Sequence, residues 1–293
     1  MTADYVINIL ASITLVEMMV TIGLGVNLSD VLNVGRKGGL VARSALANYV
    51  LVPAAAVGLL LLFRAQPMVA AGILVAAACP GAPYGPPFTS MAKGNVAVAV
   101  GLMVILAGSS AIVAPILLRV LLPVVTGDAS LNINVAKIVG TLLGAQLLPL
   151  GAGLWLRRQY PTLADTLKRP ATLLSTLLNL LTLGVILFVQ FRVLIGIRLV
   201  SYLGMLLLVI ATIAAGWVSG RNMNEDQKSM VLTTGVRNVG VGLVIVSSSF
   251  PGTAAITAAI AFALFQTIVL ALIASAWGRL TPDAIVSTSR RAA

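Results

Sequence analysis

Two hydrophobic segments of this chain are interrupted in the middle, and these interruptions constrain the fold more than any other feature. The first interruption reads Cys-Pro-Gly-Ala-Pro-Tyr-Gly-Pro-Pro over residues 79–87, and the second reads Thr-Thr-Gly-Val-Arg-Asn-Val-Gly over residues 233–240. A backbone that leaves the helix within a bilayer is tolerated only where it packs in protein or faces a polar cavity. We therefore expect both breaks to lie inside a bundle of helices.

The composition is that of an all-α polytopic membrane protein. Of the 293 residues, 59% are hydrophobic and only 9% are charged, and the mean hydropathy is +1.05. A helix needs roughly 20 apolar residues to cross a bilayer. The sequence predicts nine such segments in one domain, at residues 6–26, 39–62, 68–92 (broken), 95–122, 132–156, 171–191, 198–219, 226–249 (broken) and 252–278.

The basic residues gather between these segments and alternate by side, which argues against nucleic-acid binding despite a net charge of +11. One side has thirteen of the nineteen, namely Arg36, Lys37, Arg43, Lys93, Arg157, Arg158, Lys168, Arg169, Arg221, Lys228, Arg279, Arg290 and Arg291. The other side has five, which are Arg64, Arg119, Lys137, Arg192 and Arg198. The richer side is expected to be cytoplasmic. We expect a multi-pass protein of the cell (inner) membrane, without a signal peptide, whose N-terminus is outside and whose C-terminus is cytoplasmic.

Several kinds of chemistry are excluded by what the sequence lacks. Cys79 is the only cysteine and there is no histidine, so an intrachain disulfide, a Cys or His metal site and a histidine proton relay are all excluded. Clustered carboxylates and a nucleophile with a base are missing too. We expect neither an enzyme nor a bound cofactor or metal.

The order of the segments suggests an internal repeat. The third of four segments is broken in the first half, and the fourth of five is broken in the second half. If the halves are inverted repeats, the first half lacks one N-terminal helix, and the broken segments mark a transporter's binding site. The alternative is that residues 132–156 are mis-assigned as a crossing.

Four prolines make an unbroken helix across the first interruption improbable, because proline removes a backbone donor and clashes with the preceding turn. We expect Tyr84 and Thr89 to lie near a cavity there. Asn95 either faces the same cavity or caps the next helix. The lone amides Gln146, Asn179, Gln190 and Gln266 are expected to form hydrogen bonds between helices.

Arg237 lies near the middle of the second broken segment. A central arginine costs about 2.5–3.5 kcal/mol on insertion scales, so a carboxylate, freed carbonyls or an anionic substrate must compensate it. Glu17 is the only acid inside a segment and lies at a similar depth, so we expect the two charges to meet or communicate. Glu17 could carry a coupling proton, or the two residues could form a permanent salt bridge.

The chain resembles the bile acid:sodium symporter family over nearly its whole length. The stretch Cys79-Pro80-Gly81, followed by Ala92-Lys93-Gly94-Asn95-Val96-Ala97, is similar to a family motif in the first broken helix. The stretch Thr233-x-Gly235-x-Arg237-Asn238 resembles the family's crossover Glu-x-Gly-x-Gln-Asn. The resemblance implies a panel domain (about residues 1–30 and 131–192) that moves against a core domain (about 38–122 and 197–279) with two crossed, discontinuous helices.

The residues that hold sodium in the family are replaced in this chain. The crossover glutamate falls on Thr233, two glutamines fall on Arg237 and Asn48, and a Ser-Asn pair falls on Gly85-Pro86. The serine and threonine ligands of the following helix fall on Ala99 and Met103. We expect both sodium sites to be lost, with the Arg237 charge taking the place of sodium. The family's substrate-facing asparagine falls on Asn238.

These observations predict a transporter that moves an organic anion, either a bile-acid-like sterol or a small carboxylate, by alternating access without sodium. The residues expected to contact the substrate are Arg237, Asn238, Tyr84 and Thr89, and those expected to couple it are Glu17 and Arg237. Sodium- or proton-coupled symport, a passive channel and a non-transporting receptor stay as alternatives. The oligomeric state does not follow from the sequence.

Overall fold

The protein is described by a computed structural model that covers residues 3–127, 133–195, 199–223 and 226–281. Throughout these ranges the regular structure is helical and contains no strand. Arg198, Arg290 and Arg291, which contribute to the predicted charge asymmetry, lie outside the described residues.

Most helices follow the predicted segments to within a few residues, but the helix predicted at 171–191 already begins at Pro161. The helices are α1 (Ala3–Gly25), α2 (Leu28–Arg36), α3 (Gly38–Leu46), the π-helical turn η1 (Ala47–Leu51), α4 (Val52–Leu62), α5 (Pro67–Ala78), α6 (Gly85–Met91), α7 (Val96–Thr126), α8 (Val135–Leu142), the π-helical turn η2 (Leu143–Leu147), α9 (Leu148–Gln159), α10 (Pro161–Ile195), α11 (Leu199–Ser219), α12 (Asp226–Gly235), α13 (Val239–Ser249) and α14 (Ala254–Leu280). Residues 38–62 form one helix through η1, and residues 135–159 form one through η2.

Six helices in the described ranges are long and apolar enough to cross a membrane, and α1 with α2 would make a seventh if the bent pair is counted as one span. The helices α5 and α6 have only 12 and 7 residues, because the first break divides their segment. The polytopic character is therefore confirmed, while nine crossings and an inverted repeat stay predictions.

Helix α2 was not predicted. It begins after Asn27, lies at 85° to α1, and buries Val31 and Val34 on one side. Asp30 in its first turn and Arg36 in its last turn both suit the helix dipole. Its short amphipathic pattern lacks the long apolar run by which the other segments were recognised.

The first break covers residues 79–84, which is shorter than predicted. Pro86 and Pro87 lie in the first turn of α6 instead of in the break. Proline is accepted there because the first backbone N–H groups of a helix have no partner inside it. Gly81 has a φ of +81°, and a Cβ at this position would collide with the backbone of Ala107 on α7. Only glycine fits this turn.

The second break covers residues 236–238 and lies against the first. The backbone N–H of Asn238 donates to the carbonyl of Cys79 over 2.7 Å, and its Nδ2 donates to the carbonyl of Gly81 over 3.3 Å. Its Oδ1 accepts from the N–H of Val241 over 3.3 Å, which caps α13. One asparagine therefore satisfies backbone groups in both breaks.

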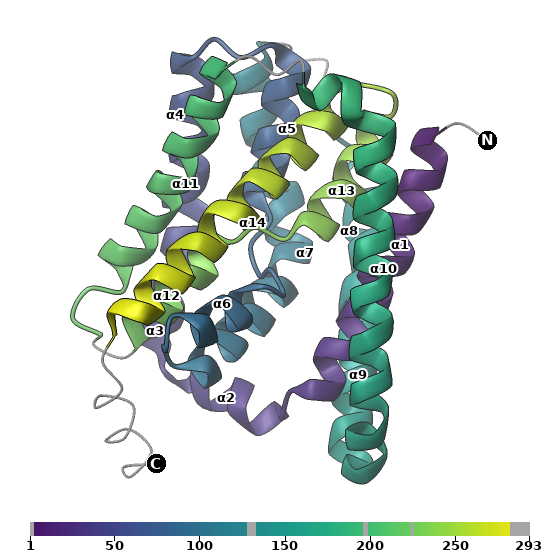
Figure 1. Cartoon of the computed structure of the whole chain (residues 1–293), viewed down its shortest axis with the longest axis vertical. Coiled ribbons are helices and arrows are strands. Elements are labelled where there is room, and N and C mark those ends of the chain that lie inside the picture. The colour runs from purple at the N-terminus through teal and green to yellow at the C-terminus, as the bar shows by residue number, and fades with distance from the viewer. Residues whose placement is uncertain (1–2, 128–132, 196–198, 224–225, 282–293) are drawn as a thin grey trace.

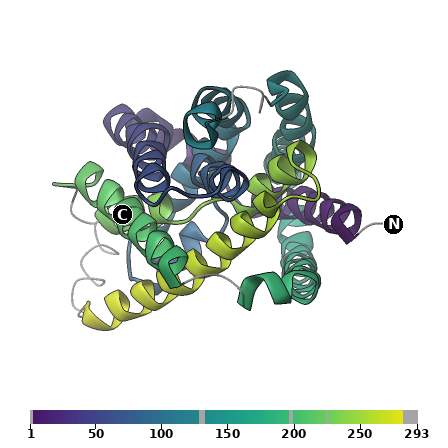
Figure 2. The ribbon, with the colours of Figure 1, turned by 90° about the horizontal axis from the view of Figure 1, so that it is seen from above.

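The helices form two groups. In Figure 1, α1, α9 and α10 stand together on the right, whereas α4 and α11 lie on the far left beside α5 and α14. Figure 2 shows the same separation from above. Helices α1 and α9 approach each other through Gly23 and Gly153, where a Cβ on either residue would collide with the opposite backbone.

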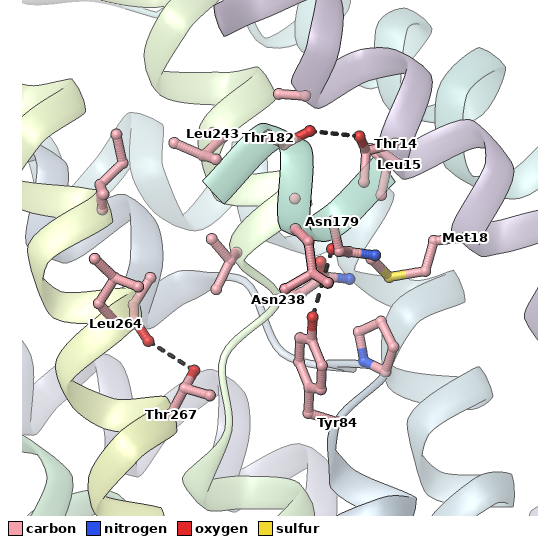
Figure 3. A pocket seen from close by; sticks show the side chains of 17 residues that line it. Thr14, Leu15, Met18, Tyr84, Asn179, Thr182, Asn238, Leu243, Leu264 and Thr267 are labelled. Carbon is pink, nitrogen blue, oxygen red and sulfur yellow. Dashed lines mark hydrogen bonds between the residues drawn. The ribbon is translucent and has the colours of Figure 1, made fainter. Parts of the chain in front are cut away.

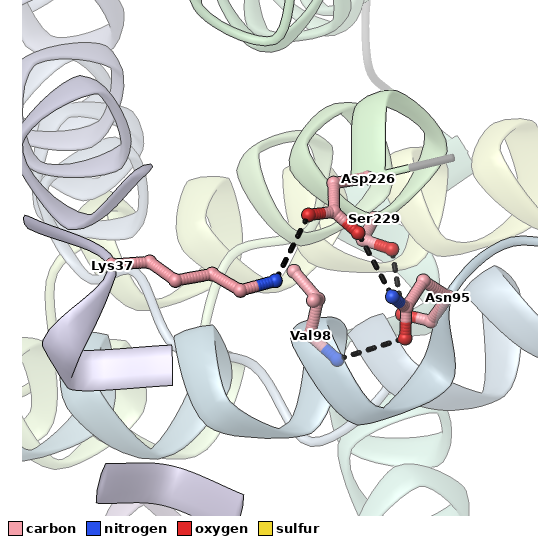
Figure 4. A network of polar contacts seen from close by, with 5 residues as sticks. All are labelled: Lys37, Asn95, Val98, Asp226 and Ser229. Atoms are coloured by element: carbon pink, nitrogen blue, oxygen red, sulfur yellow. Dashed lines mark hydrogen bonds and ion pairs between the residues drawn. The ribbon is translucent and has the colours of Figure 1, made fainter. Parts of the chain in front are cut away.

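A polar network joins three helix ends (Figure 4). Asn95 caps α7 by accepting from the N–H of Val98, and its Nδ2 donates to Asp226 over 2.8 Å. Asp226 also pairs with Lys37 at 3.4 Å, and Ser229 donates to the carbonyl of Asn95. Of the two readings for Asn95, the structure supports the helix cap.

Candidate functional site

A pocket of about 180 Å³ opens between the two groups of helices. Its walls come from α1 and α10 on one side and from the first break, α13 and α14 on the other (Figure 3). The first pair belongs to the predicted panel domain and the others to the predicted core domain. The pocket thus lies where a movement between these parts would change its size.

Most of the lining is aliphatic, and the polar groups are neutral. The polar side chains are Thr14, Tyr84, Asn179, Thr182, Asn238 and Thr267. None of the described lining residues carries a formal charge. An apolar cavity with a few convergent polar groups is typical of a small-molecule site.

Two hydrogen bonds join lining residues of the pocket, and one of them spans it. The hydroxyl of Tyr84, in the first break, donates to Oδ1 of Asn179 on α10 over 3.4 Å. The hydroxyls of Thr14 on α1 and Thr182 on α10 are 2.8 Å apart. The Tyr84–Asn179 contact joins the two groups of helices and is long for a hydrogen bond, so a ligand could replace it at little cost.

The N-terminus of α13 faces the pocket. Asn238, Val239 and Gly240 are consecutive lining residues at this end of the helix. The amide of Asn238 is engaged in joining the breaks and in capping. The N–H groups of Val239 and Gly240 lie in the first turn, where no carbonyl of the helix accepts from them. The first turn of a helix favours a negative charge.

Arg237 does not line the pocket. Its side chain is 1% exposed and is directed to oxygens on three other turns of the bundle. It donates to Oδ1 of Asn48 over 2.7 Å, to the carbonyl of Ala77 over 3.3 Å and to the carbonyl of Thr234. Only Nε has no partner among the described residues. The carbonyls of Ala77 and Thr234, in the last turns of α5 and α12, are the freed carbonyls that the sequence offered as one way to stabilise a buried arginine, whereas the Asn48 amide was not expected as a partner.

The expected meeting of Arg237 with Glu17 is wrong. No ion pair joins the two residues, and Glu17 instead accepts from the hydroxyl of Thr21 over 2.7 Å. The second carboxylate oxygen of Glu17 is buried without a hydrogen-bond partner among the described residues. Equal depth along two helices did not bring the charges together, because Arg237 is turned toward α5 and η1, away from α1.

Thr89 also lies away from the pocket. It is fully buried in α6, and its hydroxyl donates to the carbonyl of Gly85 one turn earlier over 2.9 Å. Of the four residues expected to contact substrate, the structure therefore places Tyr84 and Asn238 at the pocket, with Arg237 and Thr89 outside its lining.

Four of the seven positions that the resemblance assigns to sodium ligands of the family form two neighbouring groups. Gly85 lies against Thr233, whose hydroxyl donates to the carbonyl of Ser229 over 2.6 Å. Asn48 binds Arg237 and also donates to Thr234 Oγ1 over 3.2 Å. The remaining positions, which are all buried or within α6, are Pro86, Ala99 and Met103. The described residues contain no cluster of three His, Cys, Asp or Glu side chains that could hold a metal.

Sequence reasoning did not assign Thr14, Thr182, Asn179 and Thr267 to the site. Asn179 was expected only to bond between helices, which it does through Tyr84, and Gln146 and Gln266 behave as expected. Gln146 donates to the carbonyl of Ala107, and Gln266 donates to that of Arg237. The side chain of Gln190 lies outside the described residues. The signal that could have indicated the site is the set of polar residues on the faces of α1 and α10 that meet each other, which requires knowing that these helices are neighbours.

Comparison with known proteins identifies the family of the chain. Residues 12–218 match the Sodium Bile acid symporter family. A Bacillus subtilis (strain 168) protein described as the uncharacterized sodium-dependent transporter YocS is 25% identical over 276 residues, covering 89% of this chain and 81% of that protein. Human sodium/bile acid cotransporter 4 is 26% identical over 228 residues, covering 73% of this chain and 49% of that protein.

Proposed function

Because the chain belongs to the sodium bile acid symporter family and is a membrane transporter rather than an enzyme, we propose that it moves a small organic anion by alternating access without sodium. The observation that carries this proposal is the position of the Arg237 guanidinium, which binds three oxygens at the junction of the two breaks. Both relatives are named for sodium dependence, so this chain would differ from them in its coupling.

The guanidinium supports the loss of sodium coupling in two ways. It already uses Asn48 Oδ1 and the carbonyls of Ala77 and Thr234, which are oxygens of the kind that a hard cation binds. Its charge would also repel Na⁺ by roughly 4 kcal/mol at about 4 Å and an effective dielectric constant of about 20. In this proposal Arg237 holds the crossover together permanently, as a bound cation would do transiently.

The pocket supports an anionic substrate through α13. A carboxylate at this end would meet the N–H groups of Val239 and Gly240 and the positive end of the helix dipole. Arg237 precedes these residues in the chain, so its buried positive charge lies close to this helix end, although its side chain does not line the pocket. The Tyr84 hydroxyl and the Asn179 amide would bind other polar groups of the substrate.

The size of the pocket favours a small carboxylate in this conformation. Its volume of about 180 Å³ is below the roughly 300–1,000 Å³ of sites for drug-sized ligands. A bile-acid-like sterol would require α1 and α10 to move away from α13 and α14. Such a movement of the panel against the core, with nine crossings and the N-terminus outside, is part of the proposal.

Glu17 supports proton coupling as the second candidate. It lies one turn from Thr14 and beside Met18, which both line the pocket. The half-buried Glu17 carboxyl has one oxygen without a hydrogen-bond partner and no cation at ion-pair distance in the described structure. Sodium symport, a passive channel and a receptor stay as alternatives, although no observation in the described structure favours them.

Counterflow in proteoliposomes tests the proposal. Liposomes preloaded with an unlabelled bile acid or small carboxylate would receive the labelled compound in sodium buffer and in potassium buffer without sodium. We expect equal, saturable uptake in both buffers. Gly240→Leu, whose Cβ would already lie 3.2 Å from Leu15 on the opposite side of the lining, should abolish it, and Thr176→Val on the exposed side of α10 should leave it unchanged.

Other outcomes would separate the alternatives. Uptake that requires sodium would overturn the proposed role of Arg237, while flux that does not saturate would indicate a channel. Saturable binding without any flux of the bound compound would indicate a receptor.

A further inference from the structure

A second cavity of about 530 Å³ lies in the flank of the bundle, away from the pocket described above. It is enclosed by the end of α4, the start of α5, the start of α11 and the start of α14. Figure 1 and Figure 2 both show α4 and α11 side by side at this flank. The two cavities share α14 as a wall but have no lining residue in common.

Most of the lining is apolar. Polar side chains come from Arg64, Gln66, Ser201 and Thr257, and Arg64 is the only charged residue in the described lining. No carboxylate in the described parts of the chain lies at ion-pair distance from Arg64. A cavity with an apolar body and one cation at its end matches an amphipathic anion.

Arg64 occupies a backbone position where an arginine is unusual. It has a φ of +46° and follows the last turn of α4. Its N–H donates to the carbonyl of Leu61, and that of Ala65 donates to the carbonyl of Leu60, which together form a Schellman motif. Glycine is preferred at this left-handed position. The positive charge of Arg64 follows the C-terminal end of α4, where a cation suits the helix dipole, and it lies beside the cavity that this turn helps to line.

The outer surface around this cavity is that of a lipid-facing helix pair. Leu62 on α4 is 74% exposed and Leu199 on α11 is 85% exposed, and Leu61, Val200 and Leu203 are exposed as well. Val200 belongs to the cavity lining and to this exposed surface. The cavity therefore adjoins hydrocarbon, while Arg64 lies in the connection 63–66 at the helix ends.

We propose that this cavity binds one anionic phospholipid, with its phosphate at Arg64 and an acyl chain between α4 and α11. Arginine pairs well with phosphate, and the bilayer supplies the ligand directly beside the cavity. This proposal is independent of the transported substrate. Because Thr257 and Ala258 on α14 line the cavity and Ile260 lines the pocket, the lipid would also support the helix that forms one wall of the transport site.

The test measures lipid binding to the purified full chain in detergent by native mass spectrometry and thermal shift. The probes are phosphatidylglycerol and, as the neutral headgroup, phosphatidylethanolamine.

Three variants change the cavity. Arg64→Asn removes the charge and tolerates the left-handed backbone, Arg64→Lys keeps the charge, and Gly204→Leu fills the cavity from α11. A Cβ at Gly204 would meet only the ring of Phe63, at an ordinary contact distance of 3.7 Å. Arg119→Gln is the matched control, since Arg119 is exposed on α7 and outside the cavity.

We expect one saturable phosphatidylglycerol in the wild type and roughly tenfold weaker binding in Arg64→Asn. Arg64→Lys should recover part of it, Gly204→Leu should lose it, and Arg119→Gln should bind as the wild type does. If Gly204→Leu does not fold, Ser201→Phe fills the same cavity from one turn earlier. Unchanged binding in Arg64→Asn, or in the folded cavity-filling variant, would overturn the proposal. Binding of taurocholate, and not of phosphatidylglycerol, that the cavity-filling variant abolishes would also overturn the proposal, because it would assign the cavity to a soluble organic anion.

Discussion

The amide oxygen of Asn48 accepts a hydrogen bond of 2.7 Å from the Arg237 guanidinium, although 189 positions separate the two residues in the chain. Asn48 lies in the π-helical turn η1, and its Nδ2 donates to the carbonyl of Ser44 over 2.9 Å and to Thr234 Oγ1 over 3.2 Å. Single π-helical turns occur frequently at functional sites. Both ends of the Asn48 amide are thus held, so its oxygen presents a fixed acceptor to the arginine.

Replacing Asn48 tests whether this acceptor stabilises the crossover. Asn48→Leu has a similar size but leaves part of the buried guanidinium without a partner, so we expect a loss of about 1–3 kcal/mol in stability and a large loss of transport. Asn48→Asp keeps the acceptor for Arg237 but places a carboxylate oxygen against the Ser44 carbonyl, where Nδ2 donated, so it should recover only part of both. Thermal unfolding in detergent and uptake would be measured on the same preparations. A Leu variant as stable and active as the wild type would contradict this role.

Tyr84 and Asn179 form the contact that joins the two sides of the pocket. Tyr84→Phe and Asn179→Ala each remove one partner of a long hydrogen bond, so we expect little change in stability. If the substrate replaces this bond, each variant should raise KM about three- to tenfold, which corresponds to roughly 0.7–1.4 kcal/mol of binding. Because each side chain would bind the substrate separately once this bond is replaced, the double variant should lose at least the sum of the two single effects. The measurement is concentration-dependent uptake with Thr176→Val as control, and an unchanged KM in both variants would remove the pair from the site.

The fold was largely predictable from hydropathy and from the helix-breaking residues, because both act locally. The prolines and glycines of residues 79–87 and 233–240 indicated both breaks, and the helix bounds differ from the predicted ones by a few residues for most segments. The errors have physical causes. Pro86 and Pro87 fit the first turn of a helix, and α2 is too short and amphipathic to be seen as an apolar run.

The site was less predictable because it depends on which helix faces meet. The depth of a residue along a helix does not determine the direction in which its side chain faces around the helix axis. The matching depths of Glu17 and Arg237 therefore did not show that the two side chains face different neighbours. Asn179 and Thr182 are three residues apart on α10 and face the pocket together. Their pattern became informative only once the packing of α10 beside α1 was known.

Glu17 provides the test of proton coupling. If a proton on its carboxyl drives transport, Glu17→Gln should transport at a rate that no longer depends on pH, because glutamine is a permanently neutral substitute. Thr21→Val removes its hydrogen-bond donor and should alter the pH profile without abolishing it. Uptake would be measured across pH 5 to 8 with and without an imposed pH gradient. The same pH dependence in Glu17→Gln and in the wild type would reject proton coupling through this residue.

Restoring the family residues at Thr233 and Arg237 tests why sodium coupling would be absent. Arg237→Gln removes the cation and releases Asn48 Oδ1 and the carbonyls of Ala77 and Thr234, while Thr233→Glu supplies the anion that such a site needs. We expect the double variant to be stimulated by sodium and stabilised by it in detergent, with no comparable effect of potassium. Arg237→Gln alone should lose stability without gaining a sodium response, because the negative charge is still missing. The wild type should respond equally to both ions. A double variant that folds but shows no sodium response would mean that Gly85, Pro86, Ala99 and Met103 also prevent sodium binding, and that the guanidinium is not by itself the reason.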